Sequence, residues 1–259
     1  MQKLVIALTA MAAFSGPALA ADMAAKAPMR AAPVAYAPSW TGCYIGGGGG
    51  YSMYNAETRQ VDPTTGAFVA HQGDAGGRGY FGNVQVGCDY QFGGNFVFGA
   101  FGDYSFMDVD GDKIGPPLVF GVGSLKQDSA WAVGGRVGYL ITPSVLSYFS
   151  GGWTQSHFDQ VNYRNPLTLA LSGTALPGAT YDGWFLGSGI EHSLSFLPGL
   201  YLKTEYRFSQ FERKQLNNIV TATGAASGTA ETVKPYTHSV LTSLVYRFNW
   251  GGAPVSGRY

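Results

Sequence analysis

The stretch LYLKTEYRF, residues 200–208, alternates between two kinds of side chain at every step. Successive side chains of a β-strand point to opposite faces, so this period of two predicts a strand with one charged and one largely apolar face. The two faces carry Leu202, Thr204, Tyr206 and Phe208 against Lys203, Glu205 and Arg207. A membrane barrel has lipid outside and a polar lumen inside, so the stretch is typical of an outer-membrane strand.

Seven more segments repeat this alternation over about ten residues each. They are residues 41–54, 79–92, 96–106, 128–140, 145–158, 181–193 and 237–248. The predicted fold is therefore all-β, a transmembrane antiparallel up-and-down β-barrel of eight strands. A ten-stranded barrel stays open, because residues 167–171 resemble an additional strand edge.

The connections between these segments alternate between short and long. The short ones are residues 93–95, 141–144 and 194–199, and the long, polar ones are 55–78, 107–127, 159–180 and 209–236. Short periplasmic turns and long extracellular loops give outer-membrane barrels this asymmetry. A soluble β-sandwich would bury its apolar faces and would not need aromatic residues at both strand ends, so it is disfavoured.

The composition agrees with a membrane barrel. Only 12% of the residues are charged, whereas about 25% is usual for a soluble domain. The 16 basic and 16 acidic residues balance, which argues against a nucleic-acid partner because a nucleic-acid groove needs a basic excess. The 38 glycines and 14% aromatic residues fit short strands and tight turns.

The first twenty residues predict export. Lys3 supplies a basic start, residues 4–14 an apolar run, and residues 18–20 (ALA) a cleavage site, so 1–20 is expected to be a signal peptide. The apolar run is shorter than the roughly 20 residues of a transmembrane helix. Residues 21–40 are expected to be an Ala/Pro-rich periplasmic linker, and 41–259 the outer-membrane barrel.

Charged residues of both signs fall on the inward parity of the predicted strands. They are Asp103, Arg136, Glu191, Lys203, Glu205, Arg207 and Arg247. A lumen charge network that plugs the barrel is favoured over an ion-selective constriction, because eight strands enclose a space that side chains just fill.

Cys43 and Cys88 lie on the lipid parity of two adjacent antiparallel strands, at the same periplasmic level. The oxidising compartment permits a disulfide, but the register decides whether the Cα atoms come within reach. A cross-strand disulfide and two free thiols therefore both remain open.

Two other motifs resemble ligand-binding loops, but each is better explained as a strand or a solvated loop. Residues 46–50, all glycine, could suggest a phosphate-binding loop, but a strand rather than a helix follows them. Asp108, Asp110 and Asp112 have the spacing of calcium ligands, yet Lys113 stands where such a loop needs glycine. A solvated loop is the preferred interpretation of this acidic stretch.

The histidines and the hydroxyls predict no catalytic, cofactor or metal site. His71, His157, His192 and His238 are scattered without ligand spacing, so zinc is not expected. Ser156 and His157 are adjacent on a strand and point to opposite faces, so they cannot form a simple nucleophile–base pair.

Five short stretches resemble the alphaproteobacterial outer-membrane immunogenic-protein family, porin-like surface antigens related to the OmpA-like barrel. They are 39–47 (SWTGCYIGG), 90–92 (YQF), 135–139 (GRVGY), 189–191 (GIE) and 246–250 (YRFNW). The resemblance runs from about Trp40 to residue 259, includes the linker, and implies an eight-stranded, surface-exposed barrel. Aromatic residues are common in the family where Cys43 and Cys88 stand, and an acidic residue where Phe101 stands.

The expected function is a structural and surface-antigen role that contributes to envelope integrity in the cell outer membrane. The alternatives are a small porin-like channel and loop-mediated adhesion or ligand binding. The expected partners are outer-membrane lipid, lipopolysaccharide and the barrel-assembly machinery, without nucleic acid and without a cofactor. The sequence does not indicate the oligomeric state.

Overall fold

The computed structural model describes residues 38–115 and 121–248. All of these residues belong to one compact unit, Tyr36–Tyr259. The predicted signal peptide (1–20), the linker up to residue 37 and the final residues 249–259 lie outside the described part. In the two described ranges, no helix has the length and hydropathy needed to cross a bilayer.

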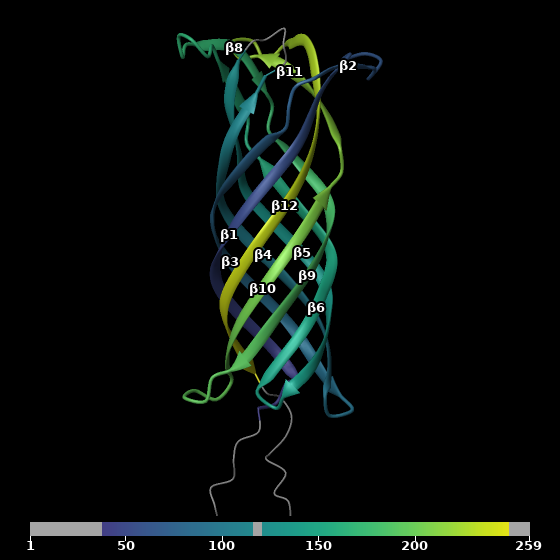
Figure 1. Ribbon diagram of the computed structural model, residues 1–259, viewed down its shortest axis with the longest axis vertical. Coiled ribbons are helices and arrows are strands. Elements are labelled where there is room, and N and C mark those ends of the chain that lie inside the picture. Colours follow the sequence, from purple (N-terminus) through teal and green to yellow (C-terminus); the bar gives the residue numbers. More distant parts are fainter. Residues whose placement is uncertain (1–37, 116–120, 249–259) are drawn as a thin grey trace, which may run out of the picture. The chain divides into compact units, whose positions relative to one another are not determined.

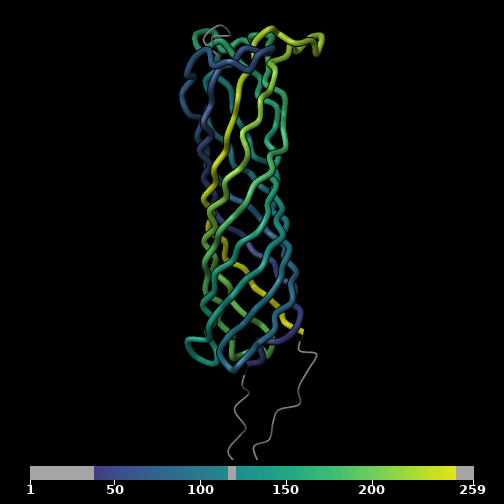
Figure 2. Tube along the Cα trace, turned by 90° about the vertical axis from the view of Figure 1, so that its right-hand side faces the viewer, coloured from purple at the N-terminus to yellow at the C-terminus, as the bar shows by residue number. Residues whose placement is uncertain are grey.

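The described chain folds into twelve β-strands. They are β1 (Gly42–Val61), β2 (Phe68–His71), β3 (Ala75–Phe92), β4 (Phe96–Ile114), β5 (Val122–Thr142), β6 (Val145–Phe158), β7 (Val161–Arg164), β8 (Leu171–Leu176), β9 (Ala179–Ser193), β10 (Leu200–Phe211), β11 (Lys214–Val220) and β12 (Ala226–Phe248). Figures 1 and 2 show the long strands winding at a tilt around a common axis.

Eight of these strands close into a ring. The order is β1-β3-β4-β5-β6-β9-β10-β12, each neighbour is antiparallel, and β12 pairs with β1 from Cys43↔Phe248 to Val61↔Ala230. The predicted eight-stranded antiparallel barrel is confirmed. Residues 165–170 form a turn, and β8 pairs with β7 and β11, so the 167–171 segment adds no strand to this ring.

The four connections predicted as long polar loops are largely strands, which corrects the sequence-based expectation. β7 continues the line of β6 after residues 159–160, β8 precedes β9 across 177–178, and β11 continues β10 after 212–213. Because β7 pairs with β5 and β8, and β11 pairs with β8 and β12, the wall keeps eight strands in this upper part. We call this end, where β2, β8 and β11 lie in Figure 1, the loop end, and the opposite end the turn end.

Two belts of exposed aromatic side chains mark the outer wall. The belt near the turn end contains Tyr90, Phe92, Phe96, Phe98, Tyr139, Tyr246 and Phe248. The second belt lies on the loop-end side and contains Tyr51, Tyr80, Tyr104, Phe106, Trp131, Trp153, Trp184 and Tyr206. Exposed aliphatic residues such as Val84, Val133, Leu186 and Leu244 lie between the belts. An apolar band between two aromatic girdles is the lipid-facing surface of an outer-membrane barrel.

Beyond the second belt the polarity of the wall inverts. Exposed outward side chains there include Arg59, Arg78, Asp110 and Asp112. The inward side chains form an apolar layer of Tyr54, Ala56, Ala75, Val109, Leu125, Phe158, Val161, Tyr163, Leu176, Tyr181, Phe211 and Val233. The strands therefore leave the lipid and continue into water with a packed interior. Their polar outward and apolar inward residues are the reverse of the pattern that identifies a lipid-facing strand.

Candidate functional site

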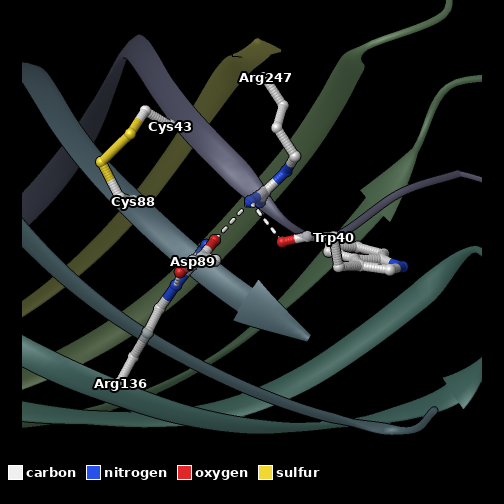
Figure 3. Close-up of a disulfide and its surroundings, with 6 residues drawn as sticks. All are labelled: Trp40, Cys43, Cys88, Asp89, Arg136 and Arg247. Atoms are coloured by element: carbon white, nitrogen blue, oxygen red, sulfur yellow. Dashed lines mark hydrogen bonds and ion pairs between the residues drawn. A yellow bond between two sulfur atoms is a disulfide. The ribbon is translucent and has the colours of Figure 1, made fainter. Parts of the chain in front are cut away.

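Four charged side chains form a closed ring in the lumen near the turn end. Arg136 on β5 and Arg247 on β12 each bind both Asp89 on β3 and Glu191 on β9. Arg136 Nε lies 2.9 Å from Asp89 Oδ1, and its Nη1 lies 2.9 Å from Glu191 Oε2. Arg247 Nη1 lies 2.5 Å from Asp89 Oδ2, and its Nη2 lies 2.7 Å from Glu191 Oε1. Figure 3 shows Asp89 between the two guanidinium groups.

A second charged group lies next to this ring, mostly on β10. Lys203 Nζ lies 3.1 Å from Glu205 Oε2, and Arg207 Nη2 lies 2.8 Å from Glu205 Oε1. Arg207 also binds Asp103 on β4 at 2.9 Å. The Tyr148 hydroxyl donates a hydrogen bond of 2.8 Å to Glu205. Alternation along β10 places its three charges on the lumen side, so one strand supplies most of the group.

The structure thus brings all seven predicted lumen charges into two adjacent groups, and adds an eighth. Asp89 lies on the inward parity of the predicted strand 79–92, although it is not among the seven charges predicted for the network. Four cations and four carboxylates share the lumen, so the network is neutral. Buried charges persist when they are paired in this way.

Aromatic rings complete the lower lumen. The Arg136 guanidinium lies 4.9 Å from the ring centroid of Tyr44 and 5.0 Å from that of Tyr148. Cation–π contacts at these distances stabilise a desolvated guanidinium. The rings also occupy the space between the ion pairs, so a layer of side chains fills the barrel here.

Trp40 closes the lumen at the turn end. Its side chain is fully buried, and its indole Nε1 donates a 3.0 Å hydrogen bond to the carbonyl of Pro143. Its own carbonyl accepts a hydrogen bond of 3.1 Å from Arg247, and its ring lies 4.8 Å from that of Tyr201. The sequence placed Trp40 at the end of the linker, whereas the structure places it inside the barrel mouth.

A small cavity of mixed polar and apolar lining separates the charged groups from the apolar layer at the loop end. Its volume is about 40 Å³, and its lining includes Ser52, Asn83, Ser105, Thr237 and Ser239. A buried water needs about 10–15 Å³ of such space, so the cavity has room for a few water molecules.

Another buried ion pair crosses the apolar layer. Lys113 Nζ on β4 lies 2.6 Å from Glu231 Oε2 on β12, and both side chains are fully buried. Tyr163 and Asn218 donate to the other carboxylate oxygen at 2.7 and 2.9 Å. Burial beside Glu231 raises the pKa of Tyr163, so its hydroxyl stays a donor. Sequence reasoning missed this group because all four residues fall in predicted loops.

A disulfide joins Cys43 on β1 to Cys88 on β3, which are direct partners in the strand register. Their Cα atoms are 3.8 Å apart. The next residues, Tyr44 and Asp89, point into the lumen, as Figure 3 shows for Asp89. The disulfide on the outer face therefore fixes two strands that carry parts of the charged ring.

The side chains of the other candidate motifs are engaged in separate contacts along the wall. Ser156 is buried and donates to the Ser129 carbonyl at 3.0 Å, whereas His157 is on the outer face and binds Thr180 at 2.9 Å. Asp108 pairs with Lys126 at 2.6 Å. Residues 46–50 lie within β1, where a Cβ atom at Gly48 would collide with the backbone of β12.

The family model for the outer membrane protein β-barrel domain matches residues 6–248. The chain is 29% identical over 227 residues to the 31 kDa outer-membrane immunogenic protein of Brucella melitensis biotype 1, which covers 84% of this chain and 90% of that protein. It is 28% identical over 250 residues to the 25 kDa outer-membrane immunogenic protein of Brucella canis, covering 96% and 99%.

A solved structure shares the fold. The outer membrane protein OprG from Pseudomonas aeruginosa matches with a TM-score of 0.53 at 12% identity, over 82% of this chain and 99% of OprG. These comparisons confirm the resemblance that the short sequence stretches indicated.

Proposed function

Because this chain belongs to the outer membrane protein β-barrel domain family, we propose that it is a closed structural barrel that anchors in the outer membrane and displays its loop end as a surface antigen. The relatives named outer-membrane immunogenic proteins support the antigen role. A contribution to envelope integrity follows from a rigid barrel that lipid surrounds.

The filled lumen is the main observation that supports a closed structural barrel. Ion pairs, aromatic rings and Trp40 occupy the turn-end half, and a cavity of about 40 Å³ separates them from the apolar layer beyond. A solute channel needs a continuous aqueous path, and this packing disfavours one. A small channel is therefore the alternative that conductance measurements test.

We also propose the partners of this barrel, from the character of its outer surface. The apolar band between the aromatic belts fits outer-membrane lipid, and the charged wall beyond it fits the lipopolysaccharide layer. Insertion would use the barrel-assembly machinery. We propose no catalytic role, because Ser156 and His157 face opposite sides of the wall and bind different partners.

Lysine labelling of intact cells tests the surface display. A membrane-impermeant amine reagent followed by mass spectrometry should modify the exposed ammonium groups of Lys126 and Lys214, on the outer wall near the loop end. Lys113 and Lys203 are buried and should remain unmodified. Absence of label at Lys126 and Lys214 would contradict display of the loop end, and label at Lys203 would contradict a closed lumen.

A further inference from the structure

Two irregularities of the backbone bring three metal-ligating side chains together on the outer wall. The register of β5 and β6 shifts between Gln127↔Phe158 and Ser129↔His157, which leaves Asp128 as an extra residue. The strand β6 ends one residue after His157, and Asp159 follows in the break before β7. Bulges re-aim side chains in this way. One ligand atom each of Asp128, His157 and Asp159 lies within 4.8 Å of the other two.

Neighbouring groups orient the side chains of His157 and Asp128, and a backbone hydrogen bond holds the main chain at Asp159. The Nδ1 atom of His157 binds the Thr180 hydroxyl at 2.9 Å, which leaves Nε2 facing Asp159 Oδ1 at 4.0 Å. The Ser129 hydroxyl donates to Asp128 Oδ1 at 3.1 Å, and the amide of Asp159 donates to the Lys126 carbonyl at 2.8 Å. Metal ligands typically have such outer hydrogen bonds, which fix the histidine tautomer and the carboxylate direction.

The ammonium group of Lys126 makes its short contact outside the trio, although its positive charge also acts on Asp159. Lys126 Nζ lies 2.6 Å from Asp108 Oδ1, a carboxylate outside the trio. The trio therefore keeps two carboxylates and one imidazole available to an external cation. His157 and Asp159 are each about half exposed, with 41% and 48% of their side chains accessible, so an ion can reach them from solvent.

We propose that Asp128, His157 and Asp159 bind a divalent transition-metal ion, for which Zn²⁺ is the best-fitting probe. Zinc takes imidazole nitrogen and carboxylate oxygen at about 2.0–2.2 Å, which places ligand atoms roughly 3.3 Å apart. From a separation of up to 4.8 Å, the ligand atoms must move as much as about 1.5 Å closer, for which the half-exposed side chains of His157 and Asp159 have room. Calcium prefers 6–8 oxygen ligands, which these three side chains do not supply. Three protein ligands leave a coordination position open to water.

Calorimetric titration of the purified, folded chain in detergent with Zn²⁺, using a competing chelator, tests the site. One equivalent should bind, and His157→Ala, Asp128→Asn and Asp159→Asn should each weaken binding by about tenfold or more. Asp110→Asn removes an exposed carboxylate outside the trio, and His192→Ala removes a histidine at the turn end. Both controls should bind as the unmodified chain does.

Chemical modification of histidine gives a second measurement. Zn²⁺ should protect His157 from diethyl pyrocarbonate, measured by mass spectrometry, and should leave the modification of His192 unchanged. Heat-modifiable mobility on gels establishes that each variant is folded. Binding that survives His157→Ala, or that falls equally in Asp110→Asn, would overturn the proposal, as would equal modification of His157 with and without Zn²⁺.

Discussion

At Asp89, one carboxylate lies between two guanidinium groups, and Glu191 faces the same two groups from the opposite side. Removing charges from water costs several kcal/mol per ion, and only good pairing geometry offsets this cost. Every cation of the lumen network has a carboxylate partner within 3.1 Å. Loss of one carboxylate should therefore cost more than an ordinary surface ion pair.

We predict that Glu205→Ala lowers the free energy of unfolding by about 3–5 kcal/mol, because it removes the carboxylate that Lys203 and Arg207 share. Urea unfolding of the barrel in lipid vesicles, followed by tryptophan fluorescence, measures the change.

Glu212→Ala is the matched control, because Glu212 follows β10 directly and is exposed. It should change the free energy of unfolding by less than about 0.5 kcal/mol. Equal effects of the two substitutions would contradict a buried, paired Glu205.

Residue parity along the eight predicted strands places the seven charges named from sequence, and Asp89 as well, on the lumen face, because a period of two fixes the face of each side chain. It gives no such information for Lys113 and Glu231, which fall in the predicted loops. It could not show which cation binds which carboxylate, since partners such as Arg207 and Asp103 lie on strands far apart in the sequence. The proximity of Asp128 and His157 could not be predicted either, because it depends on a bulge that the alternation does not reveal.

The strands β1 and β3 are held together by hydrogen bonds and by the Cys43–Cys88 disulfide. The disulfide joins two residues with a sequence separation of 45 and so restricts the unfolded chain. On this chain-entropy argument, its loss should lower the free energy of unfolding by about 2–4 kcal/mol. Urea unfolding with and without dithiothreitol measures this change.

The double substitution Cys43→Ser with Cys88→Ser is the control, because dithiothreitol should have no effect on it. Mass spectrometry of alkylated, unreduced protein should show no free thiol in the unmodified chain. Two alkylated thiols would contradict the bond.

The strand β12 closes the ring, since it pairs with β1 on one side and β10 on the other. Truncation after residue 236 should leave two unpaired edges, which lipid does not tolerate. The truncated chain should lose heat-modifiable mobility on gels and should not fractionate with outer membranes. Retention of both properties would contradict this strand assignment.

The membrane part of each strand could be predicted from sequence, because lipid selects apolar outward residues at every second position. The continuation of the strands beyond the second aromatic belt could not be predicted in this way. There water replaces lipid outside, inward residues such as Val109 and Val233 are apolar, and the alternation reverses. The length and polar character of connections such as 55–78 and 159–180 favoured the loop interpretation.

The barrel is taller than its lipid band. β12 has 23 residues, which at about 3.3 Å per residue and a tilt of about 40° spans roughly 58 Å along the axis. The apolar band of an outer-membrane barrel is about 25 Å tall. Half of the wall or more therefore extends beyond the lipid, and an apolar layer together with the buried Lys113–Glu231 pair fills the interior of this part.

Single-channel recording in planar bilayers measures most directly whether the lumen is closed. The unmodified barrel should show no steady conductance, because ion pairs, aromatic rings and Trp40 fill its turn-end half. The double variant Arg136→Ala with Glu191→Ala keeps the network neutral while emptying its centre, so it should leak more. Large, stable channels from the unmodified protein would contradict a closed structural barrel and favour a pore.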